Sequence, residues 1–116
     1  MPSSQKPVPP EQNFIGKAFE LSSLVSYQQN AVVSKQILNK KAGTLTLFAF
    51  DKGEGLSEHT APYDASILIL DGHSTVFIDG KPHALKTGEM IILPANIPHA
   101  VNAPERFKML LVMIRS

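Results

Sequence analysis

The sequence predicts an all-β domain, either a sandwich or a barrel, and two observations support this fold class. Segments rich in β-branched and aromatic residues follow one another from residue 31 to the end of the chain. Turn signals containing Gly, Asn, Asp and Pro separate these segments at short, regular intervals. About nine short strands joined by turns are therefore expected, rather than strands alternating with helices.

The chain has the length and composition of one domain with a real core. It has 116 residues, of which 43% are hydrophobic and 18% charged, and a domain of this size needs no disulfide or metal to be stable. It contains no cysteine, which excludes a disulfide framework, a thiolate metal site and a cysteine nucleophile. We expect one barrel domain over residues 14–116.

Charge and hydropathy argue against two classes of partner. The formal net charge is +1, and Lys40-Lys41 is only a pair, so no nucleic-acid surface is indicated. No apolar run approaches the roughly 20 residues that cross a bilayer, and the Pro-rich N-terminus lacks the apolar segment of a secretory signal. The expected location is the cytoplasm, which also suits a chain without cysteine.

The N-terminal region divides into two parts. Residues 1–13 hold four of the nine prolines, which excludes a helix interior or a strand ladder. This part is expected to be a flexible tail or an arm that packs on a partner subunit. In residues 14–29 the apolar positions have rough helical spacing, so a strand or turn followed by one short helix is expected to close an end of the domain.

The predicted strands follow from apolar runs and alternation. The run at 66–70 is continuously apolar, as expected of a strand buried on both faces. Asp71-Gly72 is predicted to be a turn, and Asp79-Gly80 is a strong hairpin signal. The strand segments are 32–38, 44–50, 66–70, 74–78, 83–86, 90–93, 99–103 and 107–114.

Two motifs between Gly53 and Asn102 carry a resemblance to a known family. In the first, Gly53 is followed by five residues, His59 and, thirteen residues further on, Gly72. In the second, Gly88 is followed by EMIIL, Pro94 and His99, with Asn96 at a position where the family has Gly. Asn also tolerates the left-handed conformation that such a turn demands. The stretch resembles the cupin family.

The resemblance implies a jelly-roll barrel (a double-stranded β-helix), often dimeric, with a ligand pocket inside. It also implies a site of three His and one Glu around a divalent metal. In this chain Ala61 stands at the second His position, and Ala65 stands at the Glu position with Asp64 beside it. The metal-ligand set is therefore only partly present.

One interpretation keeps a metal. His59, His99 and Asp64 would form a two-His-one-carboxylate set, which suits non-haem iron, and Fe, Mn, Ni or Zn would be the candidate ions. On a regular strand, residue 64 points away from the face that carries residue 59. A bulge near Pro62 would bring Asp64 back to that face.

The other interpretation needs no metal. His59 and His99 would line the pocket as neutral imidazoles that hydrogen-bond a ligand, and Tyr63, which has the same strand parity as His59, would line its mouth. His73 and His83 are expected to lie at strand ends on the surface, without a role in the site.

Three functions remain open at this level. The first is a barrel that binds a small molecule, because ligand sites are mostly apolar cavities with a few polar anchors. The second is a metal-dependent enzyme of the oxygenase or isomerase type. The third is a structural or regulatory module that works through homodimer contacts at edge strands and the N-terminal arm. The sequence names neither a substrate nor an activity.

Overall fold

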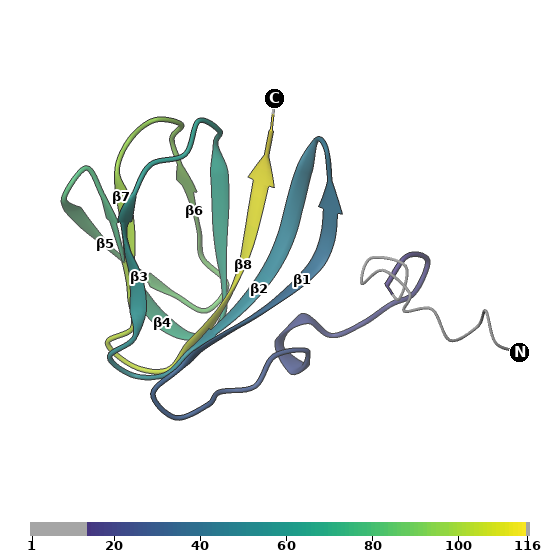
Figure 1. Ribbon diagram of the computed structural model, residues 1–116. Helices are drawn as coiled ribbons and strands as arrows, with labels where there is room; N and C mark the ends of the chain where they lie inside the picture. The colour runs from purple at the N-terminus through teal and green to yellow at the C-terminus, as the bar shows by residue number, and fades with distance from the viewer. Residues whose placement is uncertain (1–13, 116) are drawn as a thin grey trace, which may run out of the picture.

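The strands pair antiparallel throughout the part of the chain that the computed structural model describes, residues 14–115 (Figure 1). The predicted tail or arm at residues 1–13 lies outside this range. Within it the chain forms eight strands: β1 (Val32–Lys40), β2 (Gly43–Phe50), β3 (Gly55–His59), β4 (Ala65–Ile78), β5 (Lys81–Lys86), β6 (Met90–Leu93), β7 (His99–Asn102) and β8 (Phe107–Ile114).

The long strand β4 belongs to two facing halves of one curled sheet. Its first half pairs with β6 and β8, and its second half pairs with β5 and β7. We name the two halves sheet A, with the order β6–β4–β8–β2–β1, and sheet B, with the order β3–β7–β4–β5. Figure 1 shows them as two walls joined along β4. The architecture is the all-β jelly-roll barrel that the sequence predicts.

The turn predicted at Asp71-Gly72 is wrong, because these residues bend β4 instead of ending it. The register between β4 and β8 shifts between Ile69 and Asp71. Gly72 has φ +72°, and a Cβ at this position would lie 2.1 Å from the carbonyl oxygen of Arg106. Only glycine fits such a conformation and such a close approach. The predicted strands 66–70 and 74–78 are therefore one bent strand, whose two halves pair in different sheets.

The main core lies between the two walls. The Phe50 and Phe107 rings stack at a centroid distance of 4.4 Å, and both are fully buried. Around them pack the inward-facing residues of both sheets: Ala65, Ile67, Ile69, Val76, Leu85, Leu93, Val101, Ala103 and Met109. Alternate residues of each strand thus close the space between the walls.

A second apolar cluster lies on the outer face of sheet A, where the N-terminal segment covers part of β1 and β2. Val25 packs there with Ile37, Leu47 and Ala49. The predicted short helix is a single 3-10 turn, η3 (Leu21–Ser23). The segment covers a face of the sheet instead of closing an end of the domain, because its apolar side chains meet the outward residues of the strands.

Polar contacts hold this cover in place. The Tyr27 hydroxyl donates to the carboxylate of Asp71 at 2.5 Å, and Lys108 donates to the carbonyl of Ser22 at 2.6 Å. Burial, followed by the bond to Asp71, raises the pKa of Tyr27 above its ordinary value. The guanidinium of Arg106 lies 5.2 Å from the centre of the Tyr27 ring. The cover is thereby anchored at the bend of β4.

The remaining predicted turns and one unpredicted strand complete the fold. Asp79-Gly80 forms the tight hairpin between β4 and β5, with positive φ at both residues, which confirms the predicted hairpin. β3 is not among the strands that the sequence predicts, although it carries His59.

Among residues 14–115, no helix is long and apolar enough to span a bilayer.

Candidate functional site: a histidine pair inside the barrel

His59 and His99 face each other across β3 and β7. They are direct cross-strand partners, so their side chains lie on the same face of sheet B. His99 shares that face with Val101, which belongs to the main core, so both imidazoles are directed between the walls. His99 is buried, with 7% of its surface exposed, whereas His59 lies at the exposed margin.

A bulge in β3 gives His59 this orientation. Leu56 pairs with Val101 and His59 pairs with His99, so three steps along β3 match two steps along β7. Without the extra residue, Leu56 and His59 would point to opposite faces of the strand. The bulge lies before His59, at Ser57 and Glu58, and not near Pro62, where the sequence analysis places one.

The backbone offers a hydrogen-bond acceptor to Nδ1 of both rings and so favours the same tautomer in each. Nδ1 of His59 lies 2.8 Å from the carbonyl oxygen of Ser57, and Nδ1 of His99 lies 3.2 Å from that of Ile97. A carbonyl oxygen can only accept a hydrogen bond, so each Nδ1 carries the proton. Each neutral ring therefore presents an unprotonated Nε2.

The two Nε2 atoms lie 3.1 Å apart. Two unprotonated nitrogens at this distance direct lone pairs at each other, which is unfavourable unless a positive charge lies between them. A proton taken up on one Nε2 would form an N–H···N bond between the rings. The two Nε2 atoms are therefore placed to share one cation, either a proton or a metal ion.

His99 resists protonation in this environment. Burial lowers the pKa of His99, and the neighbouring His59 lowers it further, against a smaller opposite effect of the Ile97 carbonyl. Among the described residues, no carboxylate joins the two rings in a group of three or more. A protonated pair would therefore gain from a counter-charge brought by a ligand.

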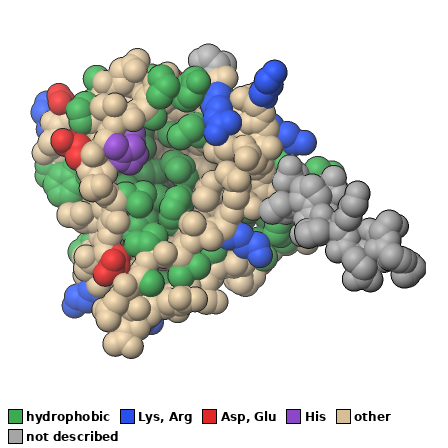
Figure 2. Space-filling model, in the orientation of Figure 1, with side chains coloured by type: hydrophobic (Ala, Val, Ile, Leu, Met, Phe, Trp, Pro, Cys, Tyr) green, Lys and Arg blue, Asp and Glu red, His purple; other side chains and the backbone are tan. Residues whose placement is uncertain are grey.

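Apolar side chains from both walls lie in the space towards which the pair is directed. Half-buried residues of five strands pack against the main core: Phe48, Leu56, Ile78, Ile91 and Leu111. Figure 2 shows hydrophobic side chains gathered in a hollow between the two walls, with histidine atoms at its margin. An apolar hollow with a few polar groups is the usual form of a small-molecule site.

Asp64 has a different place from the one expected of a metal ligand. Its carboxylate accepts a hydrogen bond from the backbone N–H of Ala95 at 2.8 Å. The N–H of Asn96 in turn donates to the carbonyl of Ala61 at 2.7 Å. These two bonds join the loop after β3 to the loop before β7. Asp64 thus holds together the two loops next to the histidines, and the structure does not bring it into their group.

The loop before β7 has the conformation that its sequence predicts. Asn96 has φ +65°, in the left-handed region that glycine and asparagine tolerate best. Asn96 thus adopts the left-handed conformation that the sequence analysis expects Asn to tolerate in this turn. His99 begins β7 three residues later.

The other residues singled out by sequence lie at the edge of the site or outside it. Tyr63 is half-buried in the loop between β3 and β4, and Ala65 is buried in the main core. His73 and His83 are exposed in β4 and β5, as expected. The carbonyls of Ser57 and Ile97 are missed by the sequence analysis, since backbone acceptors leave no signal in residue type.

The residues present do not provide the family's full metal site. Zinc and iron sites usually have three or more protein ligands, and the described residues supply two imidazoles with Asp64 engaged elsewhere. The Nε2 separation of 3.1 Å still allows both nitrogens to bind one ion at about 2.0–2.2 Å. The pair therefore fits a metal only if a ligand completes the coordination.

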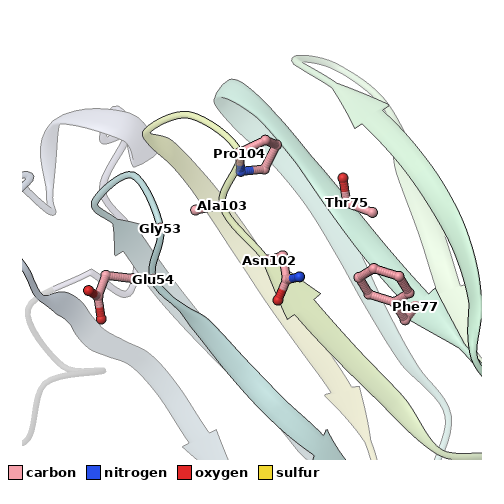
Figure 3. Close-up of a pocket in the computed structure, with 7 residues that line it drawn as sticks. All are labelled: Gly53, Glu54, Thr75, Phe77, Asn102, Ala103 and Pro104. Atoms are coloured by element: carbon pink, nitrogen blue, oxygen red, sulfur yellow. The ribbon is translucent and has the colours of Figure 1, made fainter.

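A second hollow, of about 290 Å³, lies on the outer face of sheet B (Figure 3). Thr75 and Phe77 of β4 and Asn102 of β7 line it, together with the loop residue Glu54. Residues 99 and 101 of β7 face the barrel interior, so Asn102 points the opposite way. This hollow is separate from the histidine pair, and among the described residues that line it Glu54 alone is ionisable.

Comparisons of the sequence and of the fold with known proteins lead to the same family. A model of the cupin domain matches residues 46–114. No curated protein matches the sequence. The fold is similar to that of a conserved protein of unknown function from Streptococcus pyogenes, which is 34% identical with a TM-score of 0.82 over 87% of this chain and 89% of that one.

Two further solved structures set the range of the similarity. A cupin 2 conserved barrel domain protein from Leptotrichia buccalis is 46% identical, with a TM-score of 0.82 over 84% of this chain, which spans only 47% of that protein. A salicylate 1,2-dioxygenase from Pseudaminobacter salicylatoxidans is 13% identical, with a TM-score of 0.68 over 73% of this chain and 26% of that one, and shares the fold alone. On the family match and the fold together, the chain belongs to the cupin family.

Proposed function

We propose that this cupin binds a small organic acid between its two walls, with the His59–His99 pair as the polar anchor. The observation that carries the proposal is the 3.1 Å approach of two Nε2 atoms whose rings both place Nδ1 against a backbone carbonyl. A shared proton would make the pair cationic, and a ligand carboxylate would supply a counter-charge, since no described carboxylate forms a group of three with the two rings. The apolar lining favours an acid with an apolar body.

The same observation supports a second candidate function, a metal-dependent enzyme of the oxygenase or isomerase type. His59 and His99 would hold a divalent ion, such as Fe, Mn, Ni or Zn, and the ligand would complete its coordination. Such an ion supplies Lewis-acid chemistry to a bound oxygen atom. In this case the chain's own residues fix the two Nε2 donors through the carbonyls of Ser57 and Ile97.

Thermal-shift and calorimetric titrations separate the two functions. The untagged protein is mixed with aromatic and aliphatic carboxylic acids, and with their neutral amides, first in EDTA and then with each metal ion. We expect acids, but not amides, to raise Tm in EDTA, because only acids supply the counter-charge. A shift that requires a metal ion favours the second function instead.

Variants link the effect to the histidine pair. His59→Ala and His99→Ala should each weaken acid binding at least about 10-fold, which corresponds to about 1.4 kcal/mol of the charge-assisted bond. His73→Ala, at an exposed position of β4, is the matched control. Binding that is unchanged in both pair variants, or equal binding of acids and amides, contradicts the proposal.

A further inference from the structure

The outer face of sheet B carries an uncharged surface around one aromatic ring. Val76 and Val101 belong to the main core, so the residues on either side of them in β4 and β7 point outward. A solvent-facing surface usually carries interspersed charges. Two neighbouring rows of outward residues across β5, β4 and β7 contain none: Ala84, Thr75 and Asn102 in one row, and Pro82, Phe77 and Ala100 in the other.

Backbone hydrogen bonds fix the walls of the hollow of about 290 Å³ that lies on this face (Figure 3). The N–H of Gly53 donates to the carbonyl of Ala103 at 2.8 Å, and the N–H of Ala103 donates to the carbonyl of Glu54 at 2.9 Å. These bonds join the turn before β3 to the loop after β7, and residues of both line the hollow. Because its walls are already held together, a ligand would not have to order them.

A glycine keeps space beside the polar side chain of β7 that lines the hollow. Gly55 of β3 is the cross-strand partner of Asn102. A Cβ at position 55 would clash with the carbonyl of Val101 and would lie 3.1 Å from the side-chain oxygen of Asn102. Any other residue would therefore crowd Asn102, whose side chain is left exposed at this position.

Three neutral side chains of the sheet line the hollow together: Thr75, Phe77 and Asn102. Within residues 14–115, neither the Thr75 hydroxyl nor the side-chain amide of Asn102 takes part in a hydrogen bond, whereas Ser74 donates to the backbone carbonyl of Asn102. A hydroxyl and an amide can each donate and accept. The half-buried Phe77 ring adds a flat apolar surface, whose face carries partial negative charge.

The position of the charges argues against an ionic ligand. Figure 3 shows the Glu54 carboxylate directed away from Phe77 and Asn102, so it supplies no negative charge to a cation in the hollow. His73 and Lys86 are paired in the next row and do not line the hollow, so they supply no positive charge to an anion there. A neutral ligand therefore fits this surface best.

We propose that this hollow on the outer face of sheet B binds a carbohydrate. The hydroxyls of a sugar donate to and accept from the Thr75 hydroxyl and the Asn102 amide, and the C–H face of the sugar ring packs on Phe77. Ligand pockets begin at about 300 Å³, so a hollow of about 290 Å³ takes a small ligand such as one sugar ring. This site is independent of the histidine pair, because it lies on the opposite side of sheet B.

Amide chemical shifts of the isotope-labelled full chain test the proposal. The methyl glycosides of glucose, galactose, mannose and N-acetylglucosamine are titrated into the millimolar range. At least one sugar is expected to shift the amides of residues 75–77 and 100–104 in a saturable manner, since these residues form the hollow. Tetramethylammonium and acetate, as cationic and anionic probes, should leave the amides of residues 75–77 unchanged.

Shape-conserving variants assign the binding to the outer face. Thr75→Val and Asn102→Leu remove the polar groups and keep the size of the side chains, and each should weaken sugar binding at least about 10-fold. Phe77→Ala should abolish binding, whereas Phe77→Tyr keeps the ring and should retain it. Lys86→Ala, at an exposed position in the next row, is the matched control and should bind as the wild type does.

Far-UV circular dichroism and Tm verify that each variant is folded, and the valine and leucine variants keep the test valid if Phe77→Ala does not fold. The proposal is overturned if no sugar shifts these amides, or if the cationic or anionic probe shifts them instead. Sugar binding that is unchanged in Thr75→Val and Asn102→Leu overturns it as well, because the sugar would then occupy another part of the molecule.

Discussion

At the scale of single residues, backbone groups orient the side chains of the site. His59 and His99 are separated by 39 residues and yet present the same nitrogen to each other, because carbonyls two residues before each histidine hold Nδ1. Asp64 and Asn96 have the related task of shaping the two loops that lead into and out of the pair. Their effects on stability and binding can be separated experimentally.

Asp64→Ala is expected to lower the free energy of unfolding by about 1 kcal/mol, because the Ala95 N–H loses its acceptor. It should also weaken ligand binding through the shifted loops. Asp64→Asn keeps an oxygen acceptor and is the matched control, with a smaller loss. Urea unfolding and the titrations described above measure both effects. Equal stability of the alanine variant and the wild type would show that this bond is dispensable.

Asn96→Ala is expected to cost about 1 kcal/mol of stability, because an alanine Cβ is strained at φ +65°. Asn96→Gly should remain within about 0.5 kcal/mol of the wild type, since glycine adopts this conformation freely. The difference between the two variants in urea unfolding is the measured quantity. If alanine and glycine proved equally stable, the positive φ would not be a constraint on this turn.

At the scale of elements, the bend of β4 positions everything else. One strand belongs to both walls because Gly72 allows the backbone to change direction while both halves stay paired. The same bend places Asp71 where it accepts the hydrogen bond from Tyr27 and so anchors the N-terminal cover. A disturbance at Gly72 should therefore affect both sheets and the cover together.

Gly72→Ala is expected to lower the free energy of unfolding by about 3 kcal/mol, since the new Cβ would be strained by φ and would clash with the Arg106 carbonyl. Gly53→Ala is the control for strain alone, because Gly53 has φ +86° with nothing within 4 Å of its Cβ position. It should cost about 1 kcal/mol. Urea unfolding that ranks Gly53→Ala as the more harmful change would contradict this account of the bend.

At the scale of the whole molecule, one buried carboxylate connects distant parts of the chain. Asp51, at the end of β2, accepts hydrogen bonds from the side chain of Arg106 at 2.8 Å and from the backbone of Asn30 at 2.6 Å. It thereby joins the loop before β8 to the turn before β1. The bond from Arg106, followed by that from Asn30, lowers the pKa of Asp51 below its ordinary value.

The stability contributed by Asp51 should depend on pH. In the unfolded chain an aspartate has a pKa of about 3.9, and in the fold it is lower, so the contribution is full above about pH 4 and is lost as pH falls further. Asp51→Asn should therefore be clearly less stable than the wild type at pH 7, and the difference should shrink near pH 3. Urea unfolding at both values tests this, with Asp79→Asn as the control for loss of one exposed carboxylate. A difference that stays constant between the two values would exclude the linkage.

Local sequence patterns alone determined most of the strands and turns of this protein. The alternation of β-formers predicted most strands, and Asp79-Gly80 predicted its hairpin. The resemblance of the stretch from Gly88 to His99 to the family's motif implied the loop in which Asn96 takes positive φ. These features depend on residues near one another in the chain, where backbone conformation and turn chemistry are decided.

The tertiary structure decided what pairing between distant strands controls. Register between β3 and β7 introduces the bulge that turns His59 towards His99, and the pairing of β4 with four partners joins two predicted strands into one. The contact of Asp64 with Ala95 likewise depends on two loops that meet only in the folded barrel. The sequence therefore pointed to the two histidines, and only the fold showed that their Nε2 atoms meet and that no described carboxylate completes a group of three with them. Long-range register is not encoded in any local pattern.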